Sequence, residues 1–391
     1  MDKLKKIYLN GYKSVRYDAQ LIRSSVDAES EVYRGEVIEF GDITVLLGAN
    51  GAGKSNLVSF FKMLNFMTTG SLQEYIGREG GSNCLLHYGR QVTPRMQAEI
   101  EFTTTSRTSR RTCYMMTLAD AAPDTLIFTN EAVEFQREEF TRPQEVVLGA
   151  GHRESRLKER ADHGDHTCKV IYGMLARCRT YQFHDTSQTA NIRKAGYIED
   201  ADYLRADSGN LAAYLLTVKQ ANRQYYDRII QTIRLVFPQF DDFVLEPSPR
   251  NEKYILLNWR EKGRPEYLFG PHQLSDGTLR FMALATLFLQ PIHKLPSVII
   301  IDEPELGLHP YAIAVLASMI QSAAARCQVV LSTQSTRLVD EFDLGQIVVV
   351  ERNDQMNCTR CRRPDVKALE DWIDRYTTSE LWEKNVLGGR P

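Results

Sequence analysis

Two stretches of the chain carry side chains whose types and spacing suit phosphate chemistry, and the first is residues 48–55. They read Gly-Ala-Asn-Gly-Ala-Gly-Lys-Ser and match the phosphate-binding pattern G-x-x-x-x-G-K-[ST]. Glycines let backbone N–H groups close around phosphate oxygens, and the N-terminus of a following helix adds positive potential. Lys54 would reach the β- and γ-phosphates from an exposed position, and Ser55 would bind Mg²⁺. The nucleotide-binding residues predicted here are Asn50, Gly51, Ala52, Gly53, Lys54, Ser55 and Asn56.

The second stretch is a run of β-branched residues, 298–301, that ends in Asp302 and Glu303. The run is typical of a strand buried on both faces in a parallel sheet, and such sheets bind ligands at the carboxyl ends of their strands. Asp302 would lie behind a Mg²⁺ ion and hold one of its waters, and Glu303 would reach the water that attacks the γ-phosphate. The alternative is a core strand whose terminal acids are merely solvated. The phosphate-binding pattern elsewhere in the chain favours the site.

A third stretch, residues 274–278, reads Leu-Ser-Asp-Gly-Thr and precedes an apolar helical run at 281–288. It looks like the signature loop of ABC-type ATPases, although Ser275 or Asp276 could simply cap an ordinary helix. With the other two stretches it makes the chain resemble the RecF/SMC-like branch of that class. More closely, the chain is similar to single-chain predicted ATPases grouped with the OLD and Septu (PtuA) phage-defence ATPases.

This resemblance implies a fold and an activity. The fold would be α/β, a P-loop ATPase head of ABC type with a compact, mainly helical inserted lobe. The activity would be Mg²⁺-dependent ATP hydrolysis, with ATP and Mg²⁺ as cofactors. In such ATPases the signature loop of a second chain, here Ser275 and Gly277, closes over the ATP held by the first chain. The resemblance therefore implies a homodimer that forms on ATP and acts as a switch or sensor.

The resemblance also indicates residues outside the three motifs. The related ATPases carry a basic residue and a serine after their first strand, near the nucleotide, which makes Lys13 and Ser14 candidate nucleotide contacts. A solvated turn is the alternative for these two residues. Related ATPases often place a histidine that senses the γ-phosphate where this chain has Gln334. A glutamine can hydrogen-bond to phosphate but cannot carry a proton, so Gln334 is predicted as a contact only.

A glutamine at a strand-to-loop junction contacts Mg²⁺ and the attacking water in ABC-type ATPases. Gln182, in the alternating stretch 181–187, is the predicted counterpart, as a metal contact and as a catalytic residue. His184 is the second choice and Gln97 a weaker competitor. A strand with polar edges is the alternative for this stretch.

The order of predicted elements places these motifs on one discontinuous domain. Residues 1–180 and 271–391 would form the two halves of the ATPase head, and 181–270 the inserted lobe, helical and then stranded. The segment 70–89 is rich in glycine and polar residues and reads as irregular. Strands are predicted at 4–9, 36–47, 254–259, 298–303, 328–335 and 347–351, with two or three more within 96–148. Helices are predicted at 56–64, 169–178, 204–233, 281–288 and 311–325.

Composition excludes several classes of protein. The 391 residues are 43% hydrophobic and 25% charged, as in soluble globular proteins. No apolar run is long enough to span a bilayer and the N-terminus lacks the apolar core of a signal peptide, so we expect a cytoplasmic protein without a membrane partner. The seven cysteines fit a reducing compartment. Zinc is disfavoured because neither His163, His166 and Cys168 nor the pair Cys358 and Cys361 is followed by a second matched pair of ligands.

The biological role stays open at this point. A net charge of −2 gives no global case for nucleic acid, although Arg107–Arg111 or the basic group at 360–363 could contact a phosphate backbone. One hypothesis is a phage-defence ATPase that controls a separate effector such as a nuclease or toxin. A second is a RecF-like ATPase of DNA repair or DNA ends. A third is a nucleotide-bound scaffold that scarcely turns over, against which the complete acidic pair argues.

Overall fold

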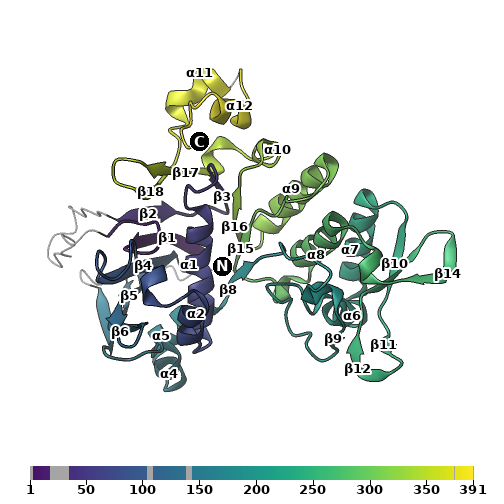
Figure 1. Cartoon of the computed structure of the whole chain (residues 1–391), viewed down its shortest axis with the longest axis horizontal. Helices are drawn as coiled ribbons and strands as arrows, with labels where there is room; N and C mark the ends of the chain where they lie inside the picture. Colours follow the sequence, from purple (N-terminus) through teal and green to yellow (C-terminus); the bar gives the residue numbers. More distant parts are fainter. Residues whose placement is uncertain (1–2, 18–34, 104–108, 138–142, 374, 391) are drawn as a thin grey trace. The chain divides into compact units, whose positions relative to one another are not determined.

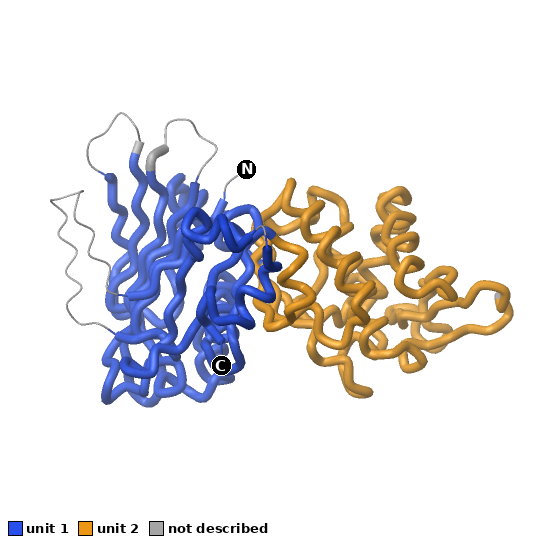
Figure 2. Tube along the Cα trace, turned by 90° about the horizontal axis from the view of Figure 1, so that it is seen from above, with its two compact units in different colours: residues 1–179, 343–391 blue, residues 180–342 orange. Residues whose placement is uncertain are grey.

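This computed structural model describes residues 3–17, 35–103, 109–137, 143–373 and 375–390 (Figure 1). The chain divides into two compact units, and Figure 2 colours them separately. Unit 1 comprises residues 1–179 and 343–391, and unit 2 comprises residues 180–342. Each unit is described by itself. No helix in the described ranges is long and apolar enough to cross a membrane.

Unit 1 contains a six-stranded antiparallel sheet in the order β2-β1-β4-β5-β6-β7. In β4, buried and more exposed residues alternate, so one face of the sheet packs into the unit and the other faces outward. Helix α5 (His166–Ala176) contacts both β6 and α1. The strands are β1 (Lys3–Asn10), β2 (Glu36–Glu39), β4 (Arg95–Thr103), β5 (Ser109–Ala121), β6 (Thr125–Arg137) and β7 (Gln144–Gly149).

A second set of strands in unit 1 positions the phosphate-binding loop. β3 (Ile43–Leu47) is wholly buried, and α1 (Lys54–Thr68) begins at the end of the loop that follows it. β17 (Ile347–Asn353) runs parallel to β3 and pairs antiparallel with β18 (Cys358–Arg362). The loop therefore emerges from the carboxyl end of a buried parallel strand, as the sequence predicts.

The prediction that residues 70–89 are irregular is wrong. They contain α2 (Leu72–Arg78) and the short α3 (Ser82–Leu85). The Glu154 carboxylate accepts hydrogen bonds from the backbone N–H groups of Leu72 at 2.8 Å and Gln73 at 2.9 Å. This cap satisfies two free donors in the first turn of α2, and it comes from about 80 residues further along the chain. A local pattern could not reveal it. The remaining helices of unit 1 are α4 (Leu157–Asp162), α11 (Glu370–Ile373) and α12 (Thr378–Glu383).

In unit 2, buried parallel strands carry the acidic stretch. β15 (Val298–Asp302) and β16 (Gln328–Thr333) pair in parallel, and every residue of both is buried. Helix α8 (Asp276–Leu289) is buried from Leu279 onward and contacts α7 and α9 (Pro310–Ala324). The short α10 (Thr336–Val339) follows β16. The pairing of the two strands places Asp302 opposite Ser332.

The rest of unit 2 combines two helices with two small sheets. The predicted helical run at 204–233 is divided at Asn222, whose non-helical backbone (φ −154°, ψ 76°) ends α6 (Leu211–Ala221) and precedes α7 (Arg223–Val236). The predicted strand at 254–259 is likewise interrupted, by a turn in which Asn258 N–H donates to the Leu256 carbonyl. The sheets have the orders β10-β13-β14 and β11-β12-β9. Their strands are β9 (Gly196–Tyr197), β10 (Phe240–Val244), β11 (Pro247–Ser248), β12 (Asn251–Ile255), β13 (Asn258–Glu261) and β14 (Arg264–Phe269).

The division into units differs from the domains expected from the sequence. Residues 271–342, which we assigned to the ATPase head, lie in unit 2 together with 180–270. The boundary falls within β8 (Cys178–Tyr181). The predicted domain limits stay a prediction.

Candidate active site

The phosphate-binding loop of unit 1 ends at a helix N-terminus that no side chain caps. Gly53 precedes α1 with a φ of 110°, and a Cβ there would overlap the Thr359 hydroxyl. Only glycine adopts this backbone without strain. The first turn of α1 holds no acidic residue, so its N–H groups and the helix dipole are not neutralised from within the helix. The Ser55 side chain in this turn is exposed. This end of α1 can accept an anion.

Lys54 is held inside the loop, which corrects the expectation that it is exposed. Its residue is only 5% exposed. The Nζ atom donates to the carbonyl oxygens of Gly48 at 2.6 Å and Ala49 at 3.0 Å. The loop folds back around the lysine because these carbonyls need a donor, and the ammonium supplies it. Lys54 therefore shapes the loop as well as bringing a positive charge to it.

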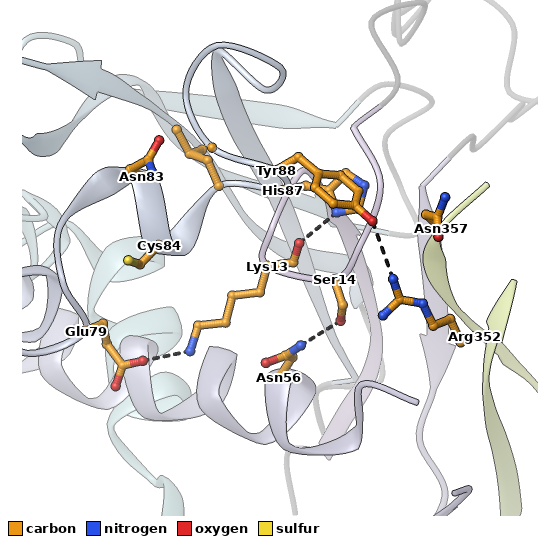
Figure 3. A pocket seen from close by; sticks show the side chains of 12 residues that line it. Lys13, Ser14, Asn56, Glu79, Asn83, Cys84, His87, Tyr88, Arg352 and Asn357 are labelled. Atoms are coloured by element: carbon orange, nitrogen blue, oxygen red, sulfur yellow. Dashed lines mark hydrogen bonds and ion pairs between the residues drawn. The ribbon is translucent and has the colours of Figure 1, made fainter. Parts of the chain in front are cut away.

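Ser14 lies against the loop through a partner that the sequence did not indicate, and its contact with the nucleotide stays a prediction. The Asn56 side chain donates to Ser14 Oγ at 2.8 Å, as Figure 3 shows. The Thr359 hydroxyl lies 2.7 Å from Ser14 Oγ and 2.8 Å from the Ala52 carbonyl, and its backbone N–H donates to the Ser14 carbonyl. Thr359 is 345 positions from Ser14, so only the pairing of β17 with β18 and β3 reveals it.

A pocket of about 640 Å³ opens beside this cluster, within the size range of small-molecule sites. Ser14 and Asn56 are among the residues that line it (Figure 3). Lys13 also lines it, but its ammonium forms an ion pair with Glu79 at 2.7 Å. The Lys13 side chain extends toward α2, in which Glu79 is the C-cap, and its role as a nucleotide contact stays a prediction.

The aromatic wall of this pocket is Tyr88, whose backbone is strained. Tyr88 has a φ of 56°, which residues other than glycine rarely adopt, and the residue is 59% exposed. Arg352 donates to its hydroxyl at 3.4 Å, and the ring of His87 packs edge-on against it. Burial lowers the pKa of the His87 imidazole, so it is neutral at pH 7. An exposed aromatic ring in a polar pocket can stack on a planar ligand.

At the end of β15, in unit 2, two buried carboxylates each bond to a hydroxyl on β16. Ser332 donates to Asp302, which is 5% exposed, and Thr333 donates to Glu305, which is 8% exposed. Burial raises the pKa of the Glu305 carboxyl. Its second oxygen has no hydrogen-bond partner among the described residues. Sequence reasoning missed Glu305 because acids beyond a strand end are usually solvated, and only the fold buries this one.

Glu303, the predicted catalytic residue, differs from its two acidic neighbours. It is half-buried, with a φ of 40° in the left-handed region. Its backbone N–H donates to the Ser332 carbonyl at 3.0 Å, which fixes this conformation. Such strained residues cluster at active sites, where the surrounding structure determines their conformation. No hydrogen bond of the Glu303 carboxylate to another described residue is present.

His184, the second choice at the strand-to-loop junction, is the residue that the structure brings to this acidic end. Its Nε2 lies 2.8 Å from the Asp302 carbonyl. Arg280, buried in α8, donates to the carbonyls of Phe183 at 2.8 Å and His184 at 3.1 Å. The Gln182 backbone N–H donates to Ala206, but no hydrogen bond from its side chain to a described residue is present. The metal-contact role of Gln182 stays a prediction.

The signature stretch forms a helix cap. Ser275 Oγ accepts a hydrogen bond from Thr278 N–H at 3.1 Å and starts α8, which is the alternative considered from the sequence. Gly277 lies so close to the Gly307 carbonyl that a Cβ would overlap it. Ser275 is exposed at the start of the helix, so it is accessible to a ligand as well. Its contact with ATP stays a prediction.

A buried arginine that the sequence did not single out holds this stretch. Arg193 is 3% exposed and donates to Asp276 at 2.6 Å, to the Leu274 carbonyl at 3.2 Å and to the Thr186 carbonyl at 2.7 Å. It therefore ties the signature stretch to the segment that follows the strand-to-loop junction. Gln334 is half-buried immediately after β16, and its role as a phosphate contact stays a prediction.

The remaining candidates do not gather into sites in the described residues. Over those ranges no group of three or more His, Cys, Asp or Glu side chains could hold a metal ion. Gln97 receives a hydrogen bond from Asn10 on the neighbouring strand β1. Among the basic residues, Arg107 and the side chain of Arg110 lie outside the described part of the chain. The other arginines have partners within the chain: Arg111 pairs with Glu99 and Glu134, Arg360 with Glu36, and Arg362 with Glu351. Arg363 donates to the carbonyls of Glu39 and Gly345. A DNA contact stays a prediction.

Comparison with known proteins supports the fold. Residues 187–340 match the family described as "AAA domain, putative AbiEii toxin, Type IV TA system". No curated protein matches the chain. A solved SMC head bound to the C-terminal winged-helix domain of ScpA is 15% identical, with a TM-score of 0.54 over 94% of this chain and 99% of that one. The Pyrococcus furiosus Smc head domain with an extended coiled coil, bound to the C-terminal domain of ScpA, is 15% identical, with a TM-score of 0.56 over 96% of this chain and 99% of that one. The predicted α/β P-loop head fold is thus confirmed, as the fold of SMC heads, whereas the likeness to OLD and Septu ATPases stays a prediction.

Proposed function

We propose that this protein is a Mg²⁺-dependent ATP hydrolase that works as a switch. One observation carries the proposal: a phosphate-binding loop on an uncapped helix N-terminus and a strand that ends at Asp302, followed by Glu303, occur in one chain with the fold of SMC heads. The matched AAA family supports nucleotide binding. A scaffold that scarcely turns ATP over would not need the strained Glu303.

The roles of the residues follow from their chemistry. Backbone N–H groups at the start of α1 and the Lys54 ammonium would hold the phosphates. The Ser55 hydroxyl in unit 1 is a hard oxygen donor of the kind Mg²⁺ prefers, and so is the Asp302 carboxylate in unit 2, so the chemistry of each residue suits the ion. When bound, Mg²⁺ would neutralise charge developing on the phosphate oxygens. Glu303 would orient the attacking water and accept its proton, with Gln182 and Gln334 as further polar contacts.

The pocket beside the loop is proposed to take the nucleoside half of ATP. It shares Ser14 and Asn56 with the loop cluster, so a nucleotide bound through its phosphates could place its base there. Tyr88 presents an exposed ring for stacking, and Arg352 lies at its hydroxyl. Stacking of a base on an aromatic side chain is worth about 1–3 kcal/mol.

Substitution of Tyr88 tests this placement. Tyr88→Ala should weaken ATP binding by about 5- to 150-fold, the equivalent of the stacking energy, whereas Tyr88→Phe should bind nearly as tightly as the wild type. Titration calorimetry with ATP and with triphosphate alone separates the two halves of the ligand. Equal ATP affinity in Tyr88→Ala and the wild type would show that the base of ATP does not bind in this pocket.

The switch is proposed to act through association. ATP would join two chains through the signature residues Ser275 and Gly277, and a partner effector, a nuclease or toxin in anti-phage defence, would respond to the closed state. The toxin–antitoxin description of the matched family supports this role. The solved SMC heads are bound to domains of ScpA, which supports a partner protein for this chain.

The direct test uses the purified wild-type protein. Phosphate release from ATP should require Mg²⁺ and stop on chelation, and light scattering should show a mass increase toward a dimer with ATP but not with ADP. If the protein binds ATP in the presence of Mg²⁺ but releases no phosphate, the hypothesis of a nucleotide-bound scaffold is supported instead of hydrolysis. Absence of ATP binding by calorimetry would overturn the proposal.

A further inference from the structure

The phosphate-binding loop is in contact with a segment near the other end of the sequence. This segment, Leu387, Gly388 and Gly389, is called here the Gly-Gly segment. The Ala49 backbone N–H, at the second position of the loop, donates to the Gly389 carbonyl at 3.2 Å. The Ala49 carbonyl in turn accepts from Lys54 Nζ at 3.0 Å. One loop residue thus connects the Gly-Gly segment to the lysine that is proposed to bind phosphate.

The Gly-Gly segment is itself fixed by a charged pair on the β17–β18 hairpin. The Gly389 N–H donates to a carboxylate oxygen of Glu351 at 3.1 Å. Arg362 donates to the Leu387 carbonyl and forms an ion pair with Glu351 at 3.7 Å. Leu387 is 1% exposed, so the segment is anchored by its side chain as well as its backbone. All of these residues belong to unit 1.

The shape of the segment requires both of its glycines. Their φ angles are 73° at Gly388 and 70° at Gly389, in the region that other residues rarely adopt. A Cβ on Gly389 would lie 2.6 Å from a methyl carbon of Val349 on β17. Because Val349 is itself buried, it cannot move aside freely. A side chain at Gly389 must therefore push the segment, and with it the Ala49 hydrogen bond, out of place.

We infer that the Gly-Gly segment is a positioning element for ATP binding: it fixes Ala49, and through Ala49 the loop carbonyls that hold the Lys54 ammonium. The inference rests on the proposed nucleotide-binding function. The segment itself touches no reacting atom. It acts by keeping the loop in its binding conformation before ATP arrives, which reduces the ordering that binding would otherwise require.

Two pairs of variants test the inference. Gly389→Ala adds the colliding Cβ, and its matched control is Gly70→Ala, which has the same φ of 70° but no atom within 4 Å of the added Cβ. Glu351→Ala releases the segment without adding bulk, and Glu351→Gln restores an oxygen that can accept from Gly389. We expect Gly389→Ala and Glu351→Ala to raise the KM and the Kd for Mg·ATP by about tenfold with little change in kcat. Gly70→Ala and Glu351→Gln should bind ATP nearly as tightly as the wild type.

The outcomes separate this inference from the function on which it rests. If the wild type does not bind ATP, the proposed function fails and the inference fails with it. If the wild type binds ATP and Gly389→Ala and Glu351→Ala bind it equally well, the inference is overturned while the function stands. Thermal unfolding of all four variants provides the remaining check. If the affinity for ATP falls in parallel with thermal stability in all four variants, including the two controls, the inference is also overturned.

Discussion

In unit 1, residues 48–55 bring backbone N–H groups and one ammonium to the start of α1, whereas in unit 2 β15 and the residues after it bring three carboxylates together. In unit 1 the polar side chains are held, because the Lys54 ammonium has two carbonyl acceptors and the Ser14 hydroxyl is bonded to Asn56 and Thr359. The negative group is not fully satisfied. Glu305 has a buried oxygen without a described partner, and Glu303 has a strained backbone.

This difference indicates that ATP binding and the control of the reaction are divided between the two regions. A loop whose polar side chains are already hydrogen-bonded is organised before its ligand arrives, which favours binding. At the acidic end, Glu303 with its strained backbone lies beside the buried carboxylates of Asp302 and Glu305, and this arrangement destabilises the fold. It is expected where charge and water must be controlled during a reaction. If the division is correct, substitutions in unit 1 should change ATP affinity, and substitutions at the acidic end should change turnover.

The largest effect is expected at Glu303. Glu303→Gln should bind Mg·ATP with nearly wild-type affinity, hydrolyse it about 10²- to 10⁴-fold more slowly, and accumulate as a dimer, because an amide cannot accept the proton of water. Single-turnover kinetics and light scattering measure this. Glu266→Gln, at an exposed position of the same unit, is the control. A wild-type rate, or no ATP-dependent mass increase in the mutant, would contradict the assignment.

Lys54→Ala should affect binding instead. Loss of a charged hydrogen-bond donor to phosphate corresponds to about a 10- to 150-fold weaker Kd for ATP. Since Lys54 is buried and bonded to Gly48 and Ala49, the variant should also be less stable, by about 1–3 kcal/mol. Calorimetry and thermal unfolding test both points against Lys62→Ala, in the same helix. Unchanged affinity would end the phosphate-loop assignment.

A mixed dimer tests whether the signature stretch works in the second chain. Lys54→Ala and Ser275→Arg should each be inactive alone, because every site then has one broken half. After random mixing, half of the dimers are mixed and one of their two sites is whole, so about a quarter of the wild-type activity should return. Full activity in Ser275→Arg alone would exclude a signature loop acting between chains. Mass spectrometry must confirm subunit exchange.

The smallest effect is expected at Glu305 and depends on pH. Because burial raises its folded-state pKa, its contribution to stability is present at low pH and is lost as the pH rises and the carboxyl ionises. The side chain of the Glu305→Gln variant cannot ionise, so the variant does not lose stability as the pH rises. Its free energy of unfolding should therefore exceed that of the wild type by roughly 1 kcal/mol at pH 8 and should not exceed it at pH 4. Denaturant titrations at both pH values measure the difference, and an equal effect at the two would refute the pH dependence.

Much of the fold could be predicted because its signals are local. Runs of β-branched residues predicted β3, β15, β16 and β17, since residues buried on both faces of a sheet must be apolar throughout. Prediction was weaker where distant residues decide the structure. The cap on α2 comes from Glu154, and the division of the 204–233 run depends on the backbone of a single residue, Asn222.

The sequence by itself determined which residues could bind phosphate and which could direct water, because glycine spacing, one lysine and a terminal acid pair define that chemistry locally. Only the tertiary structure decided how those residues are held. It buried Lys54 against two carbonyls, brought Thr359 to Ser14, placed His184 on Asp302, strained Glu303, and set Gly389 against Ala49. The physical reason is that hydrogen bonds and burial depend on neighbours in space, and within each unit many of these neighbours lie far apart in the sequence.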